Sequence, residues 1–292
     1  MAGIRPGREN ECISKELGDY FVKMPIPSRI ALPVCCALLQ AGAINGATLA
    51  GHPAKAGETL ELSFPVSEYF RDYAAQGGNP HPDTGRLVLM FPPGFDPARP
   101  WPILVVTSTT DAHRTGPMDA PWYRDPAIAE GWIVFASDAT IQPRNDSTTW
   151  RLAFCGAGLD LLHRQWPQST KWPVAFAGLS GGAKRSGWIG AMLATTGIVK
   201  TCGFFLAGIN DDRLSAACKT YPPTADFLKV PIWISSGQND PIARPQDQEA
   251  VKASLEHTGF RQVHLSHFLG GHELDKADLR RALKWFRRIG KF

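Results

Sequence analysis

The segment from Val174 to Gly182, which reads VAFAGLSGG, is the most informative part of the sequence. Its first four residues form a continuous apolar run, as expected for a strand that is covered on both faces of a sheet. A Gly-x-Ser-x-Gly pattern centred on Ser180 follows at once, and a stretch rich in small residues comes after it. A serine in a sharp turn between a strand and a helix crowds the positions two before and two after it, and Gly178 and Gly182 have no side chain to clash there. The segment therefore predicts a strained turn that presents Ser180 as a nucleophile above a buried strand.

Other apolar runs on both sides of this segment alternate with helical patterns, which indicates a mostly parallel central sheet with helices on both faces. The first predicted strand alternates apolar and polar residues, as a half-buried strand does. The last one is short and more polar, which suits a sheet edge. We expect strands at 57–65, 86–91, 102–106, 132–136, 173–177, 203–206, 230–234 and 263–267, and helices at 149–164, 183–195, 246–257 and 274–289.

Two further motifs follow Ser180 in the chain. Asp240 lies in Ser-Gly-Gln-Asn-Asp-Pro after a predicted buried strand, and His272 lies in Gly-Gly-His-Glu after the last predicted strand. The order Ser, acid, His resembles that of the α/β-hydrolase superfamily, and the resemblance covers about residues 57–292. It implies an α/β-hydrolase fold, with Ser180 as nucleophile, His272 as general base and Asp240 as the carboxylate that orients the base.

The acid has competitors in the sequence. Asp211 and Asp212 follow the predicted strand at 203–206 and could supply the carboxylate from another position. His264 and His267 lie near His272 but fall on the predicted strand itself.

An oxyanion hole requires two backbone N–H donors. Gly181, the residue after the nucleophile, supplies the first. The second is expected from the loop after strand 102–106, where many relatives have His-Gly and this chain has Thr-Ser-Thr-Thr. Because of that difference, the second donor is the backbone N–H of either Ser108 or Thr109.

Several other residues allow two interpretations. Trp122, Tyr123 and Trp150 are expected in Pro-containing loops on the cleft side, where they either line a substrate pocket or pack against other loops. Asp138 is expected to cap or turn the chain. No His-x-x-x-His or Cys-x-x-Cys spacing predicts a metal site, and no phosphate-binding loop predicts a nucleotide cofactor.

The N-terminal region predicts export. Residues 30–44 form an uncharged, mostly apolar stretch that is too short for a comfortable membrane span and fits the apolar region of a signal peptide. Arg29 precedes this stretch, and Thr48-Leu49-Ala50 provides a small-residue exit before Gly51. We expect Met24 to be the working start, residues 1–50 to be removed, and residues 51–292 to form one secreted or periplasmic catalytic domain. The alternative is that residues 30–44 form a buried helix.

Removal of residues 1–50 would leave three cysteines, an odd number that permits at most one disulfide. Cys202 and Cys218 are the expected pair, and Cys155 would remain a thiol.

Composition excludes several classes of function. The chain has 292 residues, 43% apolar and 20% charged, with a net charge of +4 and basic residues scattered along the sequence. That pattern is ordinary for a globular enzyme and a poor match for a nucleic-acid partner. The segment from Phe91 to Pro102 resembles secreted esterases related to polyhydroxybutyrate depolymerases and feruloyl esterases, which implies a small-molecule or polymeric ester substrate. A serine peptidase on the same fold, and a binding protein on an inactive hydrolase scaffold, are the alternatives.

Overall fold

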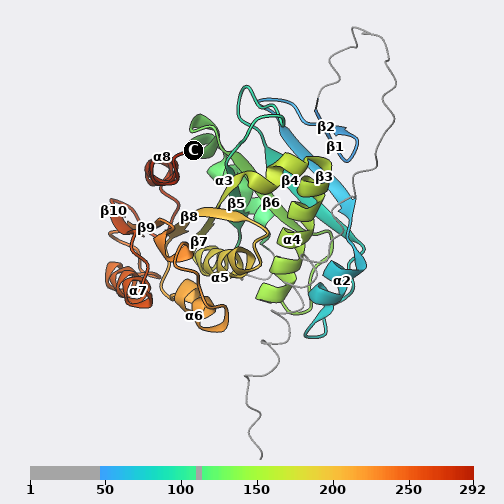
Figure 1. Ribbon diagram of the computed structural model, residues 1–292. Coiled ribbons are helices and arrows are strands. Elements are labelled where there is room, and N and C mark those ends of the chain that lie inside the picture. The colour runs from blue at the N-terminus through green and yellow to red at the C-terminus, as the bar shows by residue number, and fades with distance from the viewer. Residues whose placement is uncertain (1–46, 110–113) are drawn as a thin grey trace, which may run out of the picture.

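The computed structural model describes residues 47–109 and 114–292, and Figure 1 gives its layers. The strands are β1 (Thr48–Leu49), β2 (His52–Pro53), β3 (Thr59–Pro65), β4 (Thr84–Met90), β5 (Ile103–Thr107), β6 (Ile133–Ala139), β7 (Pro173–Leu179), β8 (Lys200–Ala207), β9 (Ile232–Gly237) and β10 (Val263–Phe268). The helices are α2 (Glu68–Ala75), α3 (Gly116–Ala129), α4 (Thr148–Gln165), α5 (Gly181–Thr195), α6 (Arg213–Thr220), α7 (Pro245–Thr258) and α8 (Lys276–Gly290), with 3-10 turns at Pro167–Lys171 and Phe227–Lys229.

Eight of the strands form one mixed sheet in the order β10-β9-β8-β7-β5-β6-β4-β3. The strands from β10 to β6 pair in parallel, whereas β4 pairs antiparallel with both β6 and β3. The eight predicted strands are all present, and β10 is an edge strand as its polar sequence predicts. The nucleophile segment forms β7, in the middle of the sheet.

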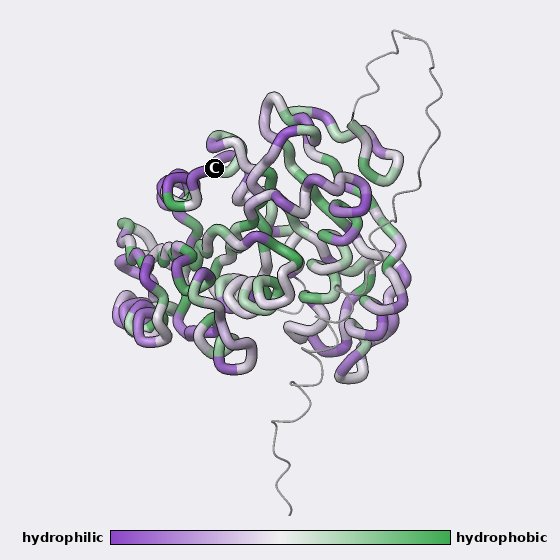
Figure 2. Tube along the Cα trace, in the orientation of Figure 1, coloured by the Kyte–Doolittle hydropathy of each residue, from purple (hydrophilic) through white to green (hydrophobic). Residues whose placement is uncertain are grey.

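Side-chain alternation along each strand divides the core into two layers. One layer contains Phe176 and Phe204 and packs against α2, α4 and α5, while the other contains Ala175 and Phe205 and packs against α3 and α8. Figure 2 shows apolar residues concentrated along the central strands. Because both faces are covered, the central strands carry apolar residues on both sides, which explains their continuous apolar runs.

Three helices were not predicted from sequence. The longest, α3, contains Pro121 and Pro126, and prolines of this kind usually indicate a loop. The other two, α2 and α6, have only eight residues each. Asp212, considered above as a candidate acid, is instead the N-cap of α6, where its side chain accepts a hydrogen bond from Ser215 N at 2.9 Å.

The expected disulfide is wrong. Cys155, Cys202 and Cys218 are all buried free thiols. Cys202 lies in the core layer under α8, and Cys218 lies in the layer on the opposite face of the sheet, so the sheet separates them. Burial raises the pKa of the Cys155 thiol to about 12, which makes it unreactive at neutral pH.

Thr48 and Leu49, inside the segment expected to be removed, belong to the folded domain. They pair with β2, and the Leu49 side chain is completely buried. The Trp166 indole also donates a hydrogen bond to the Thr48 carbonyl at 3.1 Å. The apolar stretch at 30–44 lies outside the described residues.

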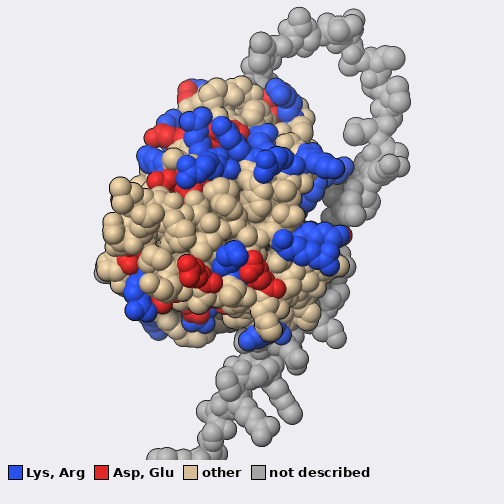
Figure 3. Space-filling model, turned by 90° about the vertical axis from the view of Figure 1, so that its left-hand side faces the viewer, with Lys and Arg blue, Asp and Glu red and all other residues tan. Residues whose placement is uncertain are grey.

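Basic side chains gather on the face formed by α8, which Figure 3 shows in blue. Several of them pair with acidic residues: Lys276 with Asp125, Arg280 with Glu130, and Arg281 with Asp278. In the described part of the chain, no helix is long and apolar enough to cross a membrane.

Candidate active site

Ser180 lies in a strained turn between β7 and α5. Its φ and ψ angles are 58° and −122°, a positive φ that few residues other than glycine adopt. The Ser180 N–H donates to the carbonyl of Ala207 at the end of β8, at 2.9 Å. Strain of this kind persists only where surrounding structure enforces it, and it is typical of functional positions.

The two flanking glycines are required by packing. A Cβ on Gly178 would lie 2.1 Å from the carbonyl carbon of Gly182, and a Cβ on Gly182 would lie 2.5 Å from the carbonyl oxygen of Thr107. The Thr107 hydroxyl fixes the same region, since it donates to the Gly182 carbonyl at 2.6 Å and bonds Ser186 Oγ at 2.8 Å. The sequence therefore specifies the turn through the absence of side chains at two positions.

Asp240 and His272 meet after β9 and β10. Asp240 Oδ2 lies 2.7 Å from His272 Nδ1, and Asp240 Oδ1 accepts hydrogen bonds from the N–H groups of Ile242 at 2.8 Å and Ala243 at 2.9 Å. The carboxyl group is fully buried, and the His272 side chain is 17% exposed. A carboxylate only accepts hydrogen bonds, so neutral His272 carries its proton on Nδ1 and leaves Nε2 free to take a proton.

Backbone contacts hold the two loops together. Asn239 N donates to the Gly270 carbonyl at 2.9 Å, and Gln238 N donates to the Phe268 carbonyl at 3.0 Å. A Cβ on Gly237 would lie 2.1 Å from the Gly271 carbonyl oxygen, so a larger residue would separate the loops. The Asp240–His272 distance thus depends on the register between β9 and β10.

The His272 ring packs beside the turn that carries Ser180. A Cβ on Gly208 would lie 3.0 Å from His272 Cε1, and Gly208 directly follows the residue that accepts the Ser180 N–H. Within the described residues, the Ser180 hydroxyl makes no hydrogen bond to this ring. Contacts between nucleophile and base commonly tighten only when substrate is bound.

The residues considered for the oxyanion hole separate into two environments. Thr109 and Gly181 line one cavity together with Ser180, whereas Ser108 is buried and its hydroxyl donates to the Arg114 carbonyl at 3.2 Å. Of these two residues, Thr109 is therefore the one that reaches the cavity beside Ser180.

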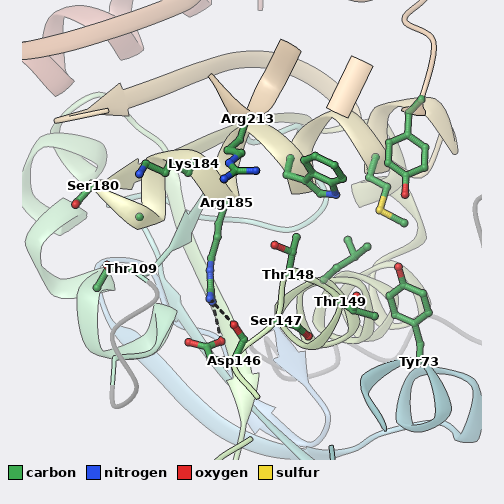
Figure 4. Close-up of a pocket in the computed structure, with 15 residues that line it drawn as sticks. Tyr73, Thr109, Asp146, Ser147, Thr148, Thr149, Ser180, Lys184, Arg185 and Arg213 are labelled. Carbon is green, nitrogen blue, oxygen red and sulfur yellow. Dashed lines mark hydrogen bonds and ion pairs between the residues drawn. The ribbon is translucent and has the colours of Figure 1, made fainter. Parts of the chain in front are cut away.

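The cavity that opens beside Ser180 has a volume of about 690 Å³ and is drawn in Figure 4. Polar and basic side chains lie near Ser180, and larger aromatic and apolar side chains lie at the far end. The lining comprises Tyr73, Thr109, Asp146, Ser147, Thr148, Thr149, Leu152, Ser180, Gly181, Lys184, Arg185, Trp188, Met192, Arg213 and Tyr221.

The three aromatic residues considered for the pocket do not line it. Tyr123 and Trp150 lie on α3 and α4 and are buried in opposite core layers. Trp122, also on α3, is partly exposed and lies under the Arg114 guanidinium, 4.4 Å from its carbon to the ring centre. Packing is therefore the correct interpretation for Tyr123 and Trp150, whereas Trp122 is exposed, and the expectation of loops is wrong for all three.

Sequence reasoning missed a buried ion network at the base of the cavity. Asp146 accepts hydrogen bonds from Arg151 Nε at 2.8 Å and from Arg185 Nη1 at 2.9 Å, and Arg151 also pairs with Asp138 at the end of β6. Burial raises the pKa of Asp146, an effect that Arg185 opposes, and burial lowers the pKa of Arg151 to about 9. The available signal was the position of Arg151 and Arg185 among small and apolar residues near the starts of their helices. Asp138 thus anchors an arginine in addition to accepting the Ala139 N–H at 2.8 Å.

No cluster of three or more metal-ligating side chains occurs among residues 47–109 and 114–292. The site as described consists of side chains and backbone N–H groups suited to nucleophilic chemistry.

Comparison with solved structures defines the class of fold. The chain is similar to a bacterial heroin esterase (TM-score 0.55, 18% identity, covering 80% of this chain and 84% of that one) and to a ferulic acid esterase (0.55, 14%, 80% and 99%). It is also similar to one of two fungal esterases from Rhizomucor miehei (0.53, 16%, 80% and 85%). No protein-family model and no curated protein sequence matches the chain. With its sheet order and the turn at Ser180, the chain has the α/β-hydrolase fold.

Proposed function

We propose that this protein hydrolyses carboxylic esters through an acyl-enzyme formed on Ser180. The observation that carries the proposal is the combination of the strained Ser180 turn with the buried Asp240–His272 pair, which packs beside that turn. Esterases on the same fold add support through fold similarity alone.

The reaction follows from the positions of these groups. Ser180 Oγ attacks the ester carbonyl carbon while His272 Nε2 takes its proton, and Asp240 stabilises the resulting imidazolium. The tetrahedral oxyanion accepts hydrogen bonds from the Gly181 and Thr109 N–H groups. His272 then returns the proton to the departing alcohol, and water, deprotonated by His272 in turn, hydrolyses the acyl-enzyme to the acid and free Ser180.

A panel of p-nitrophenyl esters of graded chain length tests this proposal. The purified protein is expected to hydrolyse at least one ester in the panel, and Ser180→Ala should reduce the rate to that of the uncatalysed reaction. A Ser180→Ala variant that retains the activity of the wild type would contradict the proposal.

The same experiment separates the two alternatives. A peptidase would release p-nitroaniline from peptide anilides as well as p-nitrophenol from matched esters, whereas an esterase would hydrolyse the esters and leave the anilides intact. A binding protein on an inactive scaffold would hydrolyse neither and would not react with a fluorophosphonate.

We also propose export to the periplasm or the medium. The buried Leu49 and the Thr48 contact with Trp166 favour a cleavage site before Thr48 over one before Gly51. Ala41-Gly42-Ala43 offers small residues in the Ala-x-Ala spacing of a signal-peptide exit, about 20 residues after Met24. N-terminal sequencing of the exported protein in its native host tests both positions.

A further inference from the structure

One face of α5 runs along the cavity and sets distances from the nucleophile. Ser180, Lys184, Trp188 and Met192 follow each other at four-residue spacing, and all four line the cavity. Each step of four residues advances about 6 Å along a helix. The backbone of Lys184 therefore lies about 6 Å along the helix from that of Ser180, and the backbone of Met192 lies about 18 Å from it.

The charges that line the cavity are mainly positive. Lys184, Arg185 and Arg213 contribute three cations, and Asp146 is the one carboxylate among the lining residues that the structure describes. Asp146 is already bonded to Arg185 and Arg151, and Arg213 Nε pairs with Asp211 at 2.6 Å. No described carboxylate lies within ion-pair distance of Lys184.

A second, buried group supports an anion near this point. The Arg185 side chain is 4% exposed, lines the same cavity and extends down to Asp146 in Figure 4. Its Nε makes no hydrogen bond to any described residue. Because Arg185 already pairs with Asp146, the uncompensated charge in this part of the cavity is the ammonium of Lys184, and Arg185 adds a hydrogen-bond donor without a described partner.

The far end of the cavity has the opposite character. Trp188 and Tyr221 meet edge to face with ring centres 6.3 Å apart, and Tyr73, Leu152 and Met192 complete an aromatic and apolar lining. Such a surface suits an aromatic or branched apolar group.

The cavity lies on the acyl side of the scissile bond. His272 must face the alcohol oxygen to return its proton, yet the cavity is lined by Ser180, Gly181 and Thr109 and by neither His272 nor Asp240. We therefore expect the alcohol to leave on the His272 side and the acyl group to extend along α5.

We propose that the preferred substrates are esters whose acyl chain carries a carboxylate about 6 Å from the reacting carbonyl, paired with Lys184, with space for an aromatic or apolar group beyond it. This inference rests on the proposed ester hydrolysis and adds the class of acyl group.

Paired substrates of equal chain length test it. The p-nitrophenyl monoester of adipic acid has a carboxylate where p-nitrophenyl hexanoate has a methyl group. In both esters this group lies about 6 Å from the reacting carbonyl carbon when the chain is extended, which matches the rise of four helical residues. The ratio of kcat/KM for the adipate ester to that for hexanoate is measured for wild type, Lys184→Gln and Lys184→Glu. Lys219→Gln serves as the matched control, because Lys219 is exposed on α6 and does not line this cavity.

The ratio should fall by about tenfold in Lys184→Gln and further in Lys184→Glu, while Lys219→Gln keeps the wild-type ratio. In the wild type the ratio should also decrease as salt is added, because the pair is partly exposed. A Lys184→Gln ratio within about twofold of wild type would overturn the inference. A second pair, 4-carboxyphenyl acetate and phenyl acetate, carries the carboxylate on the alcohol instead of the acyl group. A preference for the charged ester in this pair alone would also overturn the inference.

Fluorophosphonate labelling distinguishes a failure of the acyl-carboxylate inference from a failure of the proposed function. If Ser180 is labelled and hexanoate is hydrolysed without any charge preference, the acyl-carboxylate inference fails and the proposed function stands. If neither labelling nor hydrolysis occurs, both fail.

Discussion

Replacing Asp240 by asparagine tests how the carboxylate acts on His272. Oδ1 accepts two backbone N–H groups, from Ile242 and Ala243, and Oδ2 faces the ring. Turning the amide nitrogen toward the loop would leave both N–H groups without an acceptor, at about 1–3 kcal/mol each. The introduced amide must therefore direct its NH₂ group at His272 Nδ1, which forces the ring proton onto Nε2. The ring can then no longer take the proton of Ser180.

The expected consequence is a fall in kcat of about 10³–10⁴-fold, equivalent to about 4–5.5 kcal/mol of activation free energy, with the fold retained. The assay is p-nitrophenyl ester hydrolysis by wild type, Asp240→Asn, Asp211→Asn and Asp212→Asn, with circular dichroism as the check on folding. Asp212→Asn should keep its activity, since asparagine also caps a helix. An Asp240→Asn variant with nearly wild-type kcat, beside an Asp211→Asn or Asp212→Asn variant that has lost activity, would show that Asp240 is not the carboxylate that orients His272.

Three further predictions concern the turn, the pH dependence of stability and maturation. Gly182→Ala should destabilise the protein by more than about 3 kcal/mol or prevent folding, because its Cβ would lie 2.5 Å from the Thr107 carbonyl oxygen. Urea unfolding measures the effect. Gly197→Ala is the control that should be milder, because a Cβ there meets nothing within 4 Å and only the positive φ is unfavourable. Burial lowers the pKa of His163 from 6.5 to about 4, so the unfolded chain binds more protons than the folded chain between these pH values. The contribution of His163 to the free energy of unfolding should therefore be complete above pH 6.5 and fall as the pH drops toward 4. His163→Gln should flatten this pH dependence, and a variant with an unchanged pH profile would count against it. N-terminal sequencing of exported protein should find a terminus before Thr48, whereas cytosolic protein that retains residues 30–50 would contradict export.

The strands were predictable because burial on both faces leaves a local record. A segment such as Val174–Ala177 is apolar at every position, and that pattern does not depend on which strands lie beside it. The turn at Ser180 was predictable for a related reason, since close backbone contacts require glycine at fixed offsets. In contrast, α3 was missed because prolines usually interrupt a helix, and this helix continues through Pro121 and the buried Pro126.

Choices among residues of the same type required the three-dimensional structure. Asp211, Asp212 and Asp240 all follow predicted strands, and only the register of β9 against β10 brings Asp240 to His272. Ser108 and Thr109 differ in burial, which the sequence does not encode at single-residue resolution. The Asp146–Arg151–Arg185 network joins the start of α4 to α5, and the sequence alone does not show that these two segments lie side by side.

The central claim is that Ser180 is the nucleophile of an ester-hydrolysing site. It is tested most directly by treating the protein with a fluorophosphonate, measuring the intact mass and mapping the modified peptide. We expect one stoichiometric adduct on Ser180, loss of esterase activity in proportion to labelling, and no adduct on the folded Ser180→Ala variant. An adduct on another residue, or equal labelling of Ser180→Ala, would contradict it.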